Sequence, residues 1–276
     1  MIPYFEIPTL QIGPIPIHSF GILAAAGVLF ASWMMVKQAR ARGLDPGPLS
    51  DFGLWALVGG LIGAHLMHVL LYHPEELAQY GPLQLFKLWD GLSSTGGVLG
   101  GIGAAILFFR RRGIPFQRYS DSIALGLAPG WAIARLGCFT VHDHPGRLTN
   151  FALAVAFPGG PRHDLGLYDA MLLGAISAVL FALARRELLQ DRLLALLALL
   201  YGVGRFVLDF LRAADVPYSD ARYFGLTPAQ YVCILLMAYG AIRLALRRGP
   251  SLKAGSGAGE TAEGRSLPAT HFEQGV

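Results

Sequence analysis

Apolar stretches alternate with short polar segments along the whole chain. Seven stretches stand out, at roughly residues 18–37, 51–72, 95–109, 120–139, 166–184, 193–212 and 226–246. A helix needs about 20 mostly apolar residues to cross the hydrocarbon core of a bilayer. The pattern therefore predicts an all-α membrane protein with seven transmembrane helices, of which the third is short for a full crossing.

Composition and charge support this prediction and exclude one alternative. The 276 residues are 54% hydrophobic and only 14% charged, and the mean hydropathy is +0.48, well outside the range of an average soluble domain. The net charge of +4 does not indicate nucleic-acid binding, because the basic residues lie at the ends of apolar stretches and form no stripe with interleaved aromatics. We expect one membrane domain, residues 1–248, followed by a disordered cytoplasmic tail, residues 249–276, rich in Gly, Ser, Ala and Glu.

The distribution of Lys and Arg predicts the orientation. The first 17 residues contain neither, so they lack the basic region of a cleavable signal peptide and the first helix is expected to be retained. Most of the 22 Lys and Arg residues lie on one side of the predicted helices. Because cytoplasmic loops are enriched in Lys and Arg, the N-terminus is expected outside and the C-terminus in the cytoplasm. The basic residues assigned to the cytoplasmic side are Lys37, Arg40, Arg42, Arg110, Arg111, Arg112, Arg118, Arg185, Arg186, Arg192, Arg243, Arg247, Arg248, Lys253 and Arg265.

Small residues recur four apart in the second and third stretches. This spacing, at Gly59 and Gly63 and again at Gly96, Gly97, Gly100, Gly101 and Ala104, lets two helices approach closely within a membrane. We interpret these glycines as helix-packing positions.

Two arginines, Arg135 and Arg205, lie within apolar stretches. A guanidinium at membrane depth costs about 2.5 to more than 10 kcal/mol and usually faces a polar interior, and its planar fork suits bidentate contact with phosphate. The sequence therefore predicts an anion-binding site. In the sixth stretch Tyr201, Arg205, Asp209 and Arg212 would share one helical face, and an alternative is that Arg205 and Asp209 only form an intrahelical pair that holds the bundle together.

The densest polar segment is ARLGCFTVHDHPGR, residues 134–147. A histidine can act as a general base near neutral pH, and Asp143 is placed to orient either His142 or His144. His65 and His68, at membrane depth in the second stretch, are expected to line the same interior.

These segments together resemble the bacterial phosphatidylglycerol–prolipoprotein diacylglyceryl transferases. The resemblance runs from about residue 12 to 248 and rests on IGPIPIHSFG near the N-terminus, GGVLGG at 96–101, ARLGCF at 134–139, HDLGLYDA at 163–170, YGVGRFVLDFLR at 201–212 and LTPAQY at 226–231. The order of the motifs, their spacing and the number of apolar stretches all agree with that family.

The chain also departs from the family pattern. In the family signature Gly-Arg-x-Gly-Asn-Phe-x-Asn-x-Glu, the frame is kept by Ala134, Arg135, Gly137 and Phe139, but Cys138, Val141 and Asp143 replace the two asparagines and the glutamate. Elsewhere, Thr95 stands for the family's histidine, Phe20 for a tyrosine and His65 for an arginine, and the motif His-Pro-x-Gln-Leu-Tyr-Glu survives only as His163, Leu167, Tyr168 and Asp169.

The resemblance implies an enzyme of the bacterial inner (plasma) membrane. Its expected partners are phosphatidylglycerol, a prolipoprotein lipobox peptide and membrane lipids. No cofactor, metal or nucleic acid is expected. The chain is expected to be a monomer. With Thr95 at the histidine position, the base that activates the peptide thiol must come from elsewhere. We expect Arg135, Arg205, His142, Asp143 and His144 to be catalytic, and Arg135, Arg205, Tyr201, Asp209, Arg212, Gly137, His65 and Thr95 to bind substrate. Cys138 is interpreted as a packing residue.

Two alternatives stay open at this point. A metal-dependent membrane hydrolase could use His142, Asp143, His144, His163 and Asp164 as zinc ligands. A non-catalytic or divergent lipid-binding relative, acting on another acceptor or none, would keep the arginines and lack the reactive groups.

Overall fold

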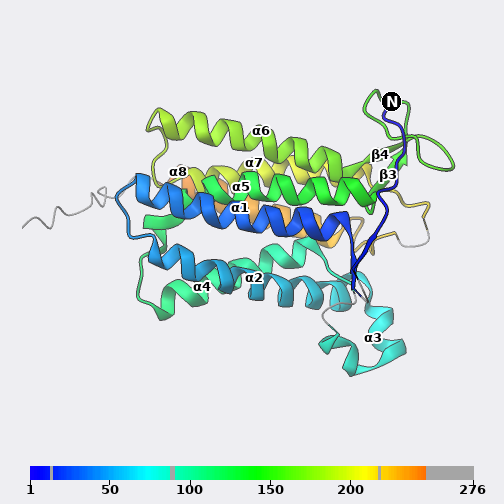
Figure 1. The fold of residues 1–276 in the computed structure, drawn as a ribbon, viewed down its shortest axis with the longest axis horizontal. Coiled ribbons are helices and arrows are strands. Elements are labelled where there is room, and N and C mark those ends of the chain that lie inside the picture. Colours follow the sequence, from blue (N-terminus) through cyan, green and yellow to red (C-terminus); the bar gives the residue numbers. More distant parts are fainter. Residues whose placement is uncertain (13–14, 88–90, 217–218, 247–276) are drawn as a thin grey trace, which may run out of the picture.

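The long helices of the structure coincide with the predicted apolar stretches. The structure is a computed structural model that describes residues 1–12, 15–87, 91–216 and 219–246; the predicted tail at 249–276 lies outside these residues. In chain order the elements are β1 (Leu10–Ile12), β2 (Ile15–Ile17), α1 (Ser19–Ala41), α2 (Gly47–Met67), the π-helical turn η1 (His68–Tyr72), α3 (Pro74–Tyr80), the 3₁₀ helix η2 (Pro82–Phe86), α4 (Ser94–Arg111), α5 (Phe116–Val141), β3 (Pro145–Leu148), β4 (Arg162–Asp164), α6 (Leu165–Arg185), α7 (Leu193–Leu208), the 3₁₀ turn η3 (Asp209–Leu211) and α8 (Pro228–Ala245). The long helices lie side by side along one direction and form a bundle (Figure 1).

Six helices in the described part of the chain are long and apolar enough to cross a membrane. They are α1, α2 with η1, α5, α6, α7 with η3, and α8. The multi-pass helical protein expected from the sequence is therefore found, but the seventh crossing is not established. Helix α4 exists where the third stretch predicted it, yet its glycines and its two terminal arginines, Arg110 and Arg111, leave it outside this group.

The glycines of α2 and α4 are contact points between these two helices. A Cβ added to Gly63 would lie 2.5 Å from the carbonyl oxygen of Gly96, and one added to Gly100 would lie 2.0 Å from that of Gly59. No side chain fits at such distances, so the expected packing role is confirmed for these positions. Gly101 differs, because a Cβ there would meet nothing within 4 Å.

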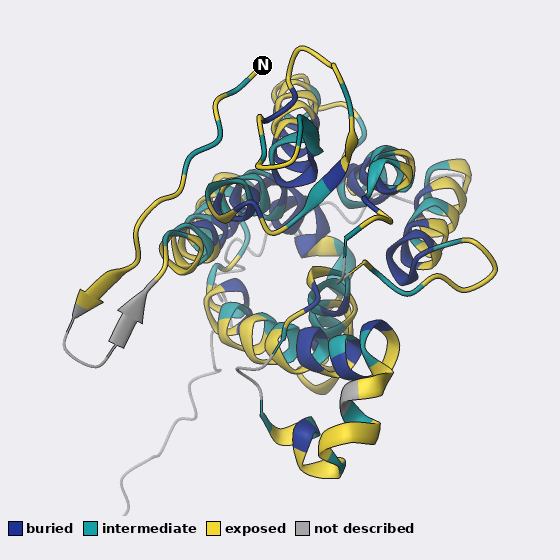
Figure 2. Cartoon of the chain, turned by 90° about the vertical axis from the view of Figure 1, so that its right-hand side faces the viewer, coloured by how far each residue is buried: buried dark blue, intermediate teal, exposed yellow. Residues whose placement is uncertain are grey.

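The bundle carries its buried residues inside and apolar residues on its outer faces. Figure 2 shows buried residues on the inner faces of the helices and exposed residues on their outer faces. Leu29 on α1, Leu54 on α2 and Leu235 on α8 are each more than 60% exposed. Apolar side chains on the outside are expected where the solvent is lipid rather than water.

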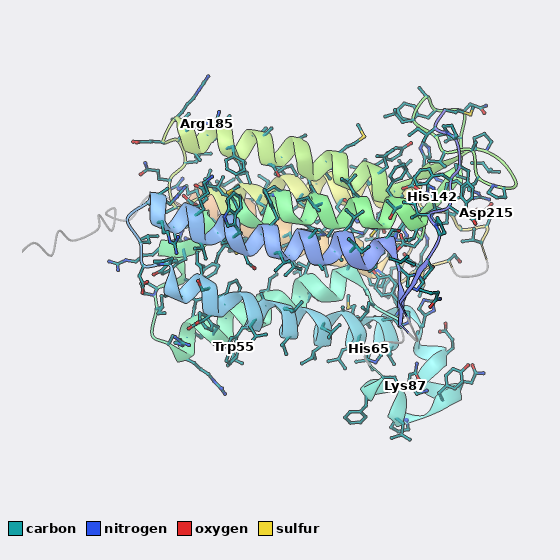
Figure 3. All side chains as sticks on the ribbon, in the orientation of Figure 1. Trp55, His65, Lys87, His142, Arg185 and Asp215 are labelled. Carbon is teal, nitrogen blue, oxygen red and sulfur yellow. The ribbon has the colours of Figure 1, made fainter. Side chains whose placement is uncertain are left out.

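One buried carboxylate fixes α7 relative to α5 at the end of the bundle where Arg185 lies (Figure 3). Asp121 on α5 is 1% exposed and accepts hydrogen bonds from the backbone nitrogens of Leu193 (2.9 Å) and Asp191 (2.7 Å). It also pairs with Arg42 at 2.9 Å. The carboxylate thus satisfies free N–H groups at the start of α7 and helps to set where Arg205 lies.

The short helices and strands lie in loops at the end of the bundle opposite Arg185. His142, Asp215 and Lys87 lie at this end (Figure 3), as do the β3–β4 pair and α3 (Figure 1). The segment after η1 carries exposed apolar side chains, with Leu83 75% and Phe86 76% exposed.

Helix α7 ends earlier than the sequence pattern predicted. It stops at Leu208, Asp209 lies in the 3₁₀ turn η3, and Arg212 has an extended backbone with φ −62° and ψ 142°. The expectation that Tyr201, Arg205, Asp209 and Arg212 share one helical face is therefore wrong for Arg212. Its guanidinium is directed instead by Asp220, whose Oδ2 lies 2.7 Å from Nε.

Candidate functional site

Asp169 on α6 joins the two membrane arginines. Its Oδ2 lies 2.8 Å from Nε of Arg135 on α5 and 3.8 Å from Nε of Arg205 on α7, and it accepts a hydrogen bond from the hydroxyl of Tyr201 at 3.4 Å. All four side chains are buried, with at most 5% of each residue exposed. The arginines therefore converge, as predicted, and one carboxylate orients both.

A second carboxylate, that of Asp209, lies close to Arg205 and farther from Arg212. Oδ1 of Asp209 lies 2.9 Å from Nη2 of Arg205 and 3.8 Å from Nη1 of Arg212, and Asp209 also accepts a hydrogen bond from the hydroxyl of Thr227. The intrahelical pair that was the alternative interpretation is thus present together with the convergence on Asp169.

Each guanidinium has five N–H donors, and Arg135 directs two of its nitrogens at neutral groups. Its Nη2 donates to the hydroxyl of Ser94 at 3.0 Å, and its Nη1 points at the sulfur of Cys138 at 3.7 Å. A phosphate can replace such neutral partners without breaking the ion pair with Asp169. Oδ1 of Asp169, in turn, is buried without a hydrogen-bond partner among the described residues.

Arg135 and Arg205 face one small cavity. Thr95, Trp131 and Tyr201 also line it, and its volume is about 20 Å³, room for about one water molecule. The ring of Trp131 packs on that of Tyr201 with centroids 4.5 Å apart. A lipid headgroup therefore enters only when these walls move.

A larger and apolar hollow begins one residue from this cavity. It has a volume of about 290 Å³ and is lined by Gly63, Leu66, Met67, Leu70, Leu71, Gly96 and Leu99. Thr95 lines the polar cavity and the next residue, Gly96, lines the apolar hollow. The two spaces are thus lined by consecutive residues at the start of α4.

The two candidate histidines of the loop after α5 have different surroundings. Asp143 is hydrogen-bonded to Nδ1 of His144, whose side chain is 20% exposed. Burial is the largest effect and holds the pKa of His144 below its ordinary value, although Asp143 acts in the opposite direction. His144 is therefore neutral at pH 7, which is the state that a general base needs.

His142 is part of the packing instead. It ends α5 in the left-handed conformation, φ 49°, and is 7% exposed. Its Nδ1 lies 2.7 Å from Oδ2 of Asp164, which also caps α6 by accepting from the backbone nitrogen of Leu167. Four aromatic rings surround the imidazole with centroids 4.8 to 5.3 Å away, those of Tyr4, Phe5, Phe139 and Phe157. His142 thus links α5, α6 and the N-terminal segment.

Cys138 lies next to both His144 and Arg135. Ligand-type atoms of Cys138, Asp143 and His144 all lie within 4.8 Å of one another, and Cys138 contacts Arg135. An imidazole and a pair of cations therefore occupy adjoining parts of one site.

Of the other residues predicted to bind substrate, His65 and Gly137 are engaged in packing. His65 is fully buried, and its ring nitrogens lie 3.2 Å from the carbonyl oxygen of Gly91 and 2.9 Å from that of Gln84, so it holds a loop against α2. Gly137 lies against α1, where an added Cβ would be 3.2 Å from the carbonyl oxygen of Phe20. Thr95 and Tyr201 do face the cavity.

Two participants escaped the sequence prediction. Ser94 binds Arg135 across helices, and nothing in its sequence context distinguishes it from an ordinary helix start. Asp169 had a usable signal, because it is an acidic residue near the start of an apolar stretch, where a charge needs a partner.

The histidine cluster of the hydrolase alternative is not assembled. His142 is bonded to Asp164, and Nδ1 of His163 lies 3.0 Å from the hydroxyl of Tyr168. Among the described residues the candidate metal-binding group is Cys138, Asp143 and His144, whose ligand-type atoms lie within 4.8 Å of one another.

The chain that forms this buried site matches a known protein family. A model of the family described as prolipoprotein diacylglyceryl transferase matches residues 8–246, most of the chain. The chain belongs to this family.

Several members of the prolipoprotein diacylglyceryl transferase family are similar over nearly their full length. A protein of Chromohalobacter salexigens is 32% identical over 243 residues, covering 86% of this chain and 91% of its own. One of Nitratidesulfovibrio vulgaris is 31% identical over 251 residues, 86% of this chain and 93% of its own, and one of Brucella canis is 35% identical over 229 residues, 77% and 81%. All three are named phosphatidylglycerol–prolipoprotein diacylglyceryl transferases.

Proposed function

We propose that this protein transfers the diacylglyceryl group of phosphatidylglycerol to the cysteine thiol of a prolipoprotein and releases glycerol 1-phosphate. The observation that carries the proposal is the convergence of Arg135 and Arg205 on the shared carboxylate of Asp169, in a chain of this family. Two oriented cations inside an apolar bundle suit a substrate that is an anionic lipid.

The arginines act on the phosphate. As the thiol sulfur bonds to the glycerol carbon, the bond from that carbon to the phosphate oxygen breaks. The negative charge on the phosphate then increases from −1 toward −2. Guanidiniums that are already oriented stabilise this charge without reorganising. Arg135 and Arg205 would each donate hydrogen bonds to the phosphate, while Asp169 keeps both guanidiniums in position.

His144 is our candidate for the base. The thiol has an ordinary pKa near 8.5, so most of it is protonated at neutral pH and its proton must be removed. His144 would take that proton, and Asp143, its hydrogen-bond partner, would orient the ring and stabilise the imidazolium that forms. The position of this pair beside Cys138 and Arg135 supports the assignment.

The lipid tails would occupy the apolar hollow. Its lining is apolar, and it includes Gly96, the residue after Thr95 of the polar cavity, so a headgroup and its acyl chains would be held on neighbouring parts of α4. Since the polar cavity has a volume of only about 20 Å³, binding would separate Trp131 from Tyr201.

The proposal includes a topology. α4 would be the seventh crossing, with the N-terminus outside and the C-terminus in the cytoplasm, in the bacterial inner membrane. The basic end of the bundle, where Arg185 lies, would then be cytoplasmic, and His144 would face outward, where exported prolipoproteins arrive. We propose a monomer formed by residues 1–248, without a cofactor.

The decisive experiment is transfer in a reconstituted system. Proteoliposomes with headgroup-labelled phosphatidylglycerol and a lipobox peptide should release labelled glycerol phosphate and yield diacylglyceryl peptide. Arg135→Lys, which keeps the charge and loses the fork, should lower kcat/KM about 100-fold or more, which corresponds to about 3 kcal/mol.

Arg112→Lys is the matched control, because Arg112 forms an exposed pair with Asp51 at the other end of the bundle. Rescue of a bacterium depleted of its own transferase supplies the test in cells. Tight binding of phosphatidylglycerol without release of glycerol phosphate would overturn the proposal and favour a non-catalytic lipid-binding relative.

A further inference from the structure

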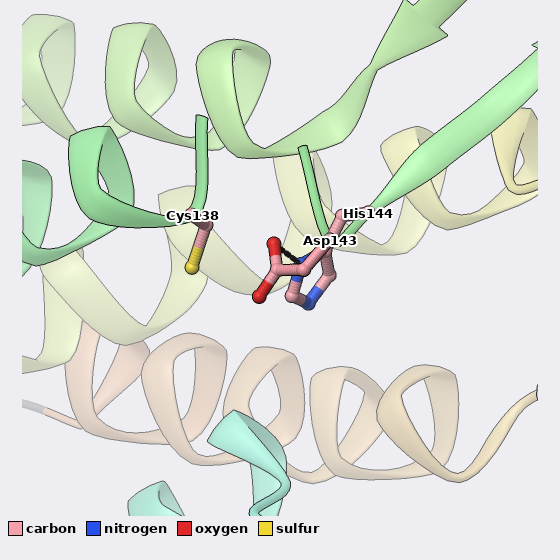
Figure 4. A group of neighbouring side chains, drawn as sticks. All are labelled: Cys138, Asp143 and His144. Atoms are coloured by element: carbon pink, nitrogen blue, oxygen red, sulfur yellow. Dashed lines mark hydrogen bonds and ion pairs between the residues drawn. The ribbon is translucent and has the colours of Figure 1, made fainter. Parts of the chain in front are cut away.

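Three side chains of different chemistry meet where α5 ends. Figure 4 shows the thiol of Cys138 beside the hydrogen-bonded side chains of Asp143 and His144. The thiol sulfur, a carboxylate oxygen and a ring nitrogen all lie within 4.8 Å of one another. Sulfur, nitrogen and oxygen are the ligand types that bind Zn²⁺ in proteins, whereas Mg²⁺ and Ca²⁺ take oxygen ligands.

The charge of the cluster suits a divalent cation. A thiolate and a carboxylate supply two negative charges, and they offset those of the ion, which matters in a partly buried position. The nearby cation Arg135 is itself paired with Asp169 at 2.8 Å. Its Nη1, 3.7 Å from the sulfur, is placed as a hydrogen-bond donor to a metal-bound thiolate, the usual kind of outer partner of a ligand.

The geometry requires only a small adjustment. In a tetrahedral site with metal–sulfur and metal–nitrogen distances of about 2.3 and 2.0 Å, ligand atoms lie roughly 3.5 Å apart. Asp143 and His144 follow the left-handed residue His142 and precede β3, so they belong to a short connection rather than to a helix. Rotation of their side chains would close the remaining distance, and the fourth position would be open to water.

We propose that Cys138, Asp143 and His144 form a binding site for Zn²⁺, and that its occupation inhibits transfer. The inhibitory part rests on the proposed function, in which His144 is the base. A neutral imidazole has one nitrogen lone pair. When that lone pair is bound to zinc, the other nitrogen carries hydrogen, and the ring can no longer accept the proton of the substrate thiol.

The metal site is tested without any measurement of activity. Protein purified without a polyhistidine tag is titrated with Co²⁺, and the thiolate-to-cobalt charge-transfer band is followed in the near ultraviolet. Wild type should show the band at one equivalent, and Zn²⁺ should displace it. Cys138→Ser should abolish it, and His144→Gln should weaken Co²⁺ binding at least 10-fold. Cys233→Ser is the control, because Cys233 is also buried but is not part of the cluster, and it should keep the band.

A thermal unfolding curve for each variant shows that it is folded. Absence of a stoichiometric band in wild type, or its persistence in folded Cys138→Ser, would overturn the metal site. Protein that binds cobalt in this way but transfers no diacylglyceryl group would keep the metal site and overturn the proposed function.

The inhibitory part has its own readout. Zn²⁺ is added to the proteoliposome assay, and inhibition is expressed relative to each protein's own rate without zinc. Cys138→Ser should need at least 10-fold more zinc for half-inhibition than wild type. Equal sensitivity of the two proteins, or full activity of wild type with zinc bound, would show that this site does not control the reaction.

Discussion

Nε of Arg135 lies 2.8 Å from Oδ2 of Asp169, and both side chains are at most 4% exposed. This pair connects α5 with α6, and the same oxygen lies 3.8 Å from Nε of Arg205 on α7. Three helices are therefore joined by one carboxylate. The carboxylate offsets part of the cost of burying the guanidiniums. Other N–H groups of Arg135 contact only neutral partners, which a phosphate can replace.

Removal of the charge on Asp169 should destabilise the protein strongly. Asp169→Asn leaves Arg135 without its carboxylate and Arg205 with Asp209 only, so we expect a loss of about 3–5 kcal/mol in the free energy of unfolding. The control is Asp51→Asn, because Asp51 and its partner Arg112 are both 51% exposed and such pairs contribute about 0–1 kcal/mol. Chemical denaturation in detergent measures both, and similar losses would contradict the shared role of Asp169.

The pH dependence of transfer should report on His144. Burial holds the pKa of His144 below its ordinary value of about 6.5, so the proposed base stays neutral at pH 7 and the rate should fall only in more acidic solution. Asp143→Asn removes a hydrogen bond and a charge that both raise this pKa. The acidic limb of the kcat/KM profile should therefore move to lower pH, while kcat falls because the ring loses its orientation. A profile that keeps the wild-type midpoint would exclude His144 as the titrating base.

The same shift affects stability, with a definite sign. The folded pKa of His144 is lower than the unfolded one, so the unfolded chain binds the proton first as the pH falls. The free energy of unfolding should decrease below about pH 6.5, and His144→Gln should remove this part of the decrease. Unfolding midpoints at pH 7.5 and 5.5 for both proteins give the comparison.

The two neighbouring histidines should behave differently when replaced. His142→Gln disturbs the link to Asp164 and the surrounding rings, so we expect a lower unfolding temperature with transfer retained in the folded fraction. His144→Gln should keep the unfolding temperature near that of wild type at pH 7.5 and lose at least 100-fold in kcat. The reverse pattern would show that His142 is the base and that His144 has the structural role.

Close packing of α2 on α4 should depend on individual glycines. Gly63→Ala places a methyl group 2.5 Å from the carbonyl oxygen of Gly96, so the helices must separate and the unfolding temperature should fall, with a cost of about 1–3 kcal/mol. Gly103→Ala is the matched control on α4, where an added Cβ meets nothing within 4 Å. It should be neutral or slightly stabilising, because alanine favours a helix by about 1 kcal/mol over glycine.

The helices were predictable because each depends on a local signal. A stretch such as 166–184 is apolar over the length that a bilayer requires, and the structure places α6 at Leu165–Arg185. The convergence of Arg135 and Arg205 was also predictable, since a charge in an apolar helix needs a partner. Local signals failed at the end of α7, where the ion pair with Asp220 and not the helical period sets the direction of Arg212.

The sequence by itself determined the apolar helices, the family resemblance and the two arginines, because hydropathy and motif spacing are properties of consecutive residues. Only the tertiary structure decided that Asp169 serves both arginines, that His142 is packed among aromatic rings while His144 is bonded to Asp143, and that Cys138 lies between His144 and Arg135. These relationships join residues on different helices or distinguish neighbours in one loop. They depend on how helices pack and where side chains turn at a helix end, and no periodicity along the chain encodes those distances.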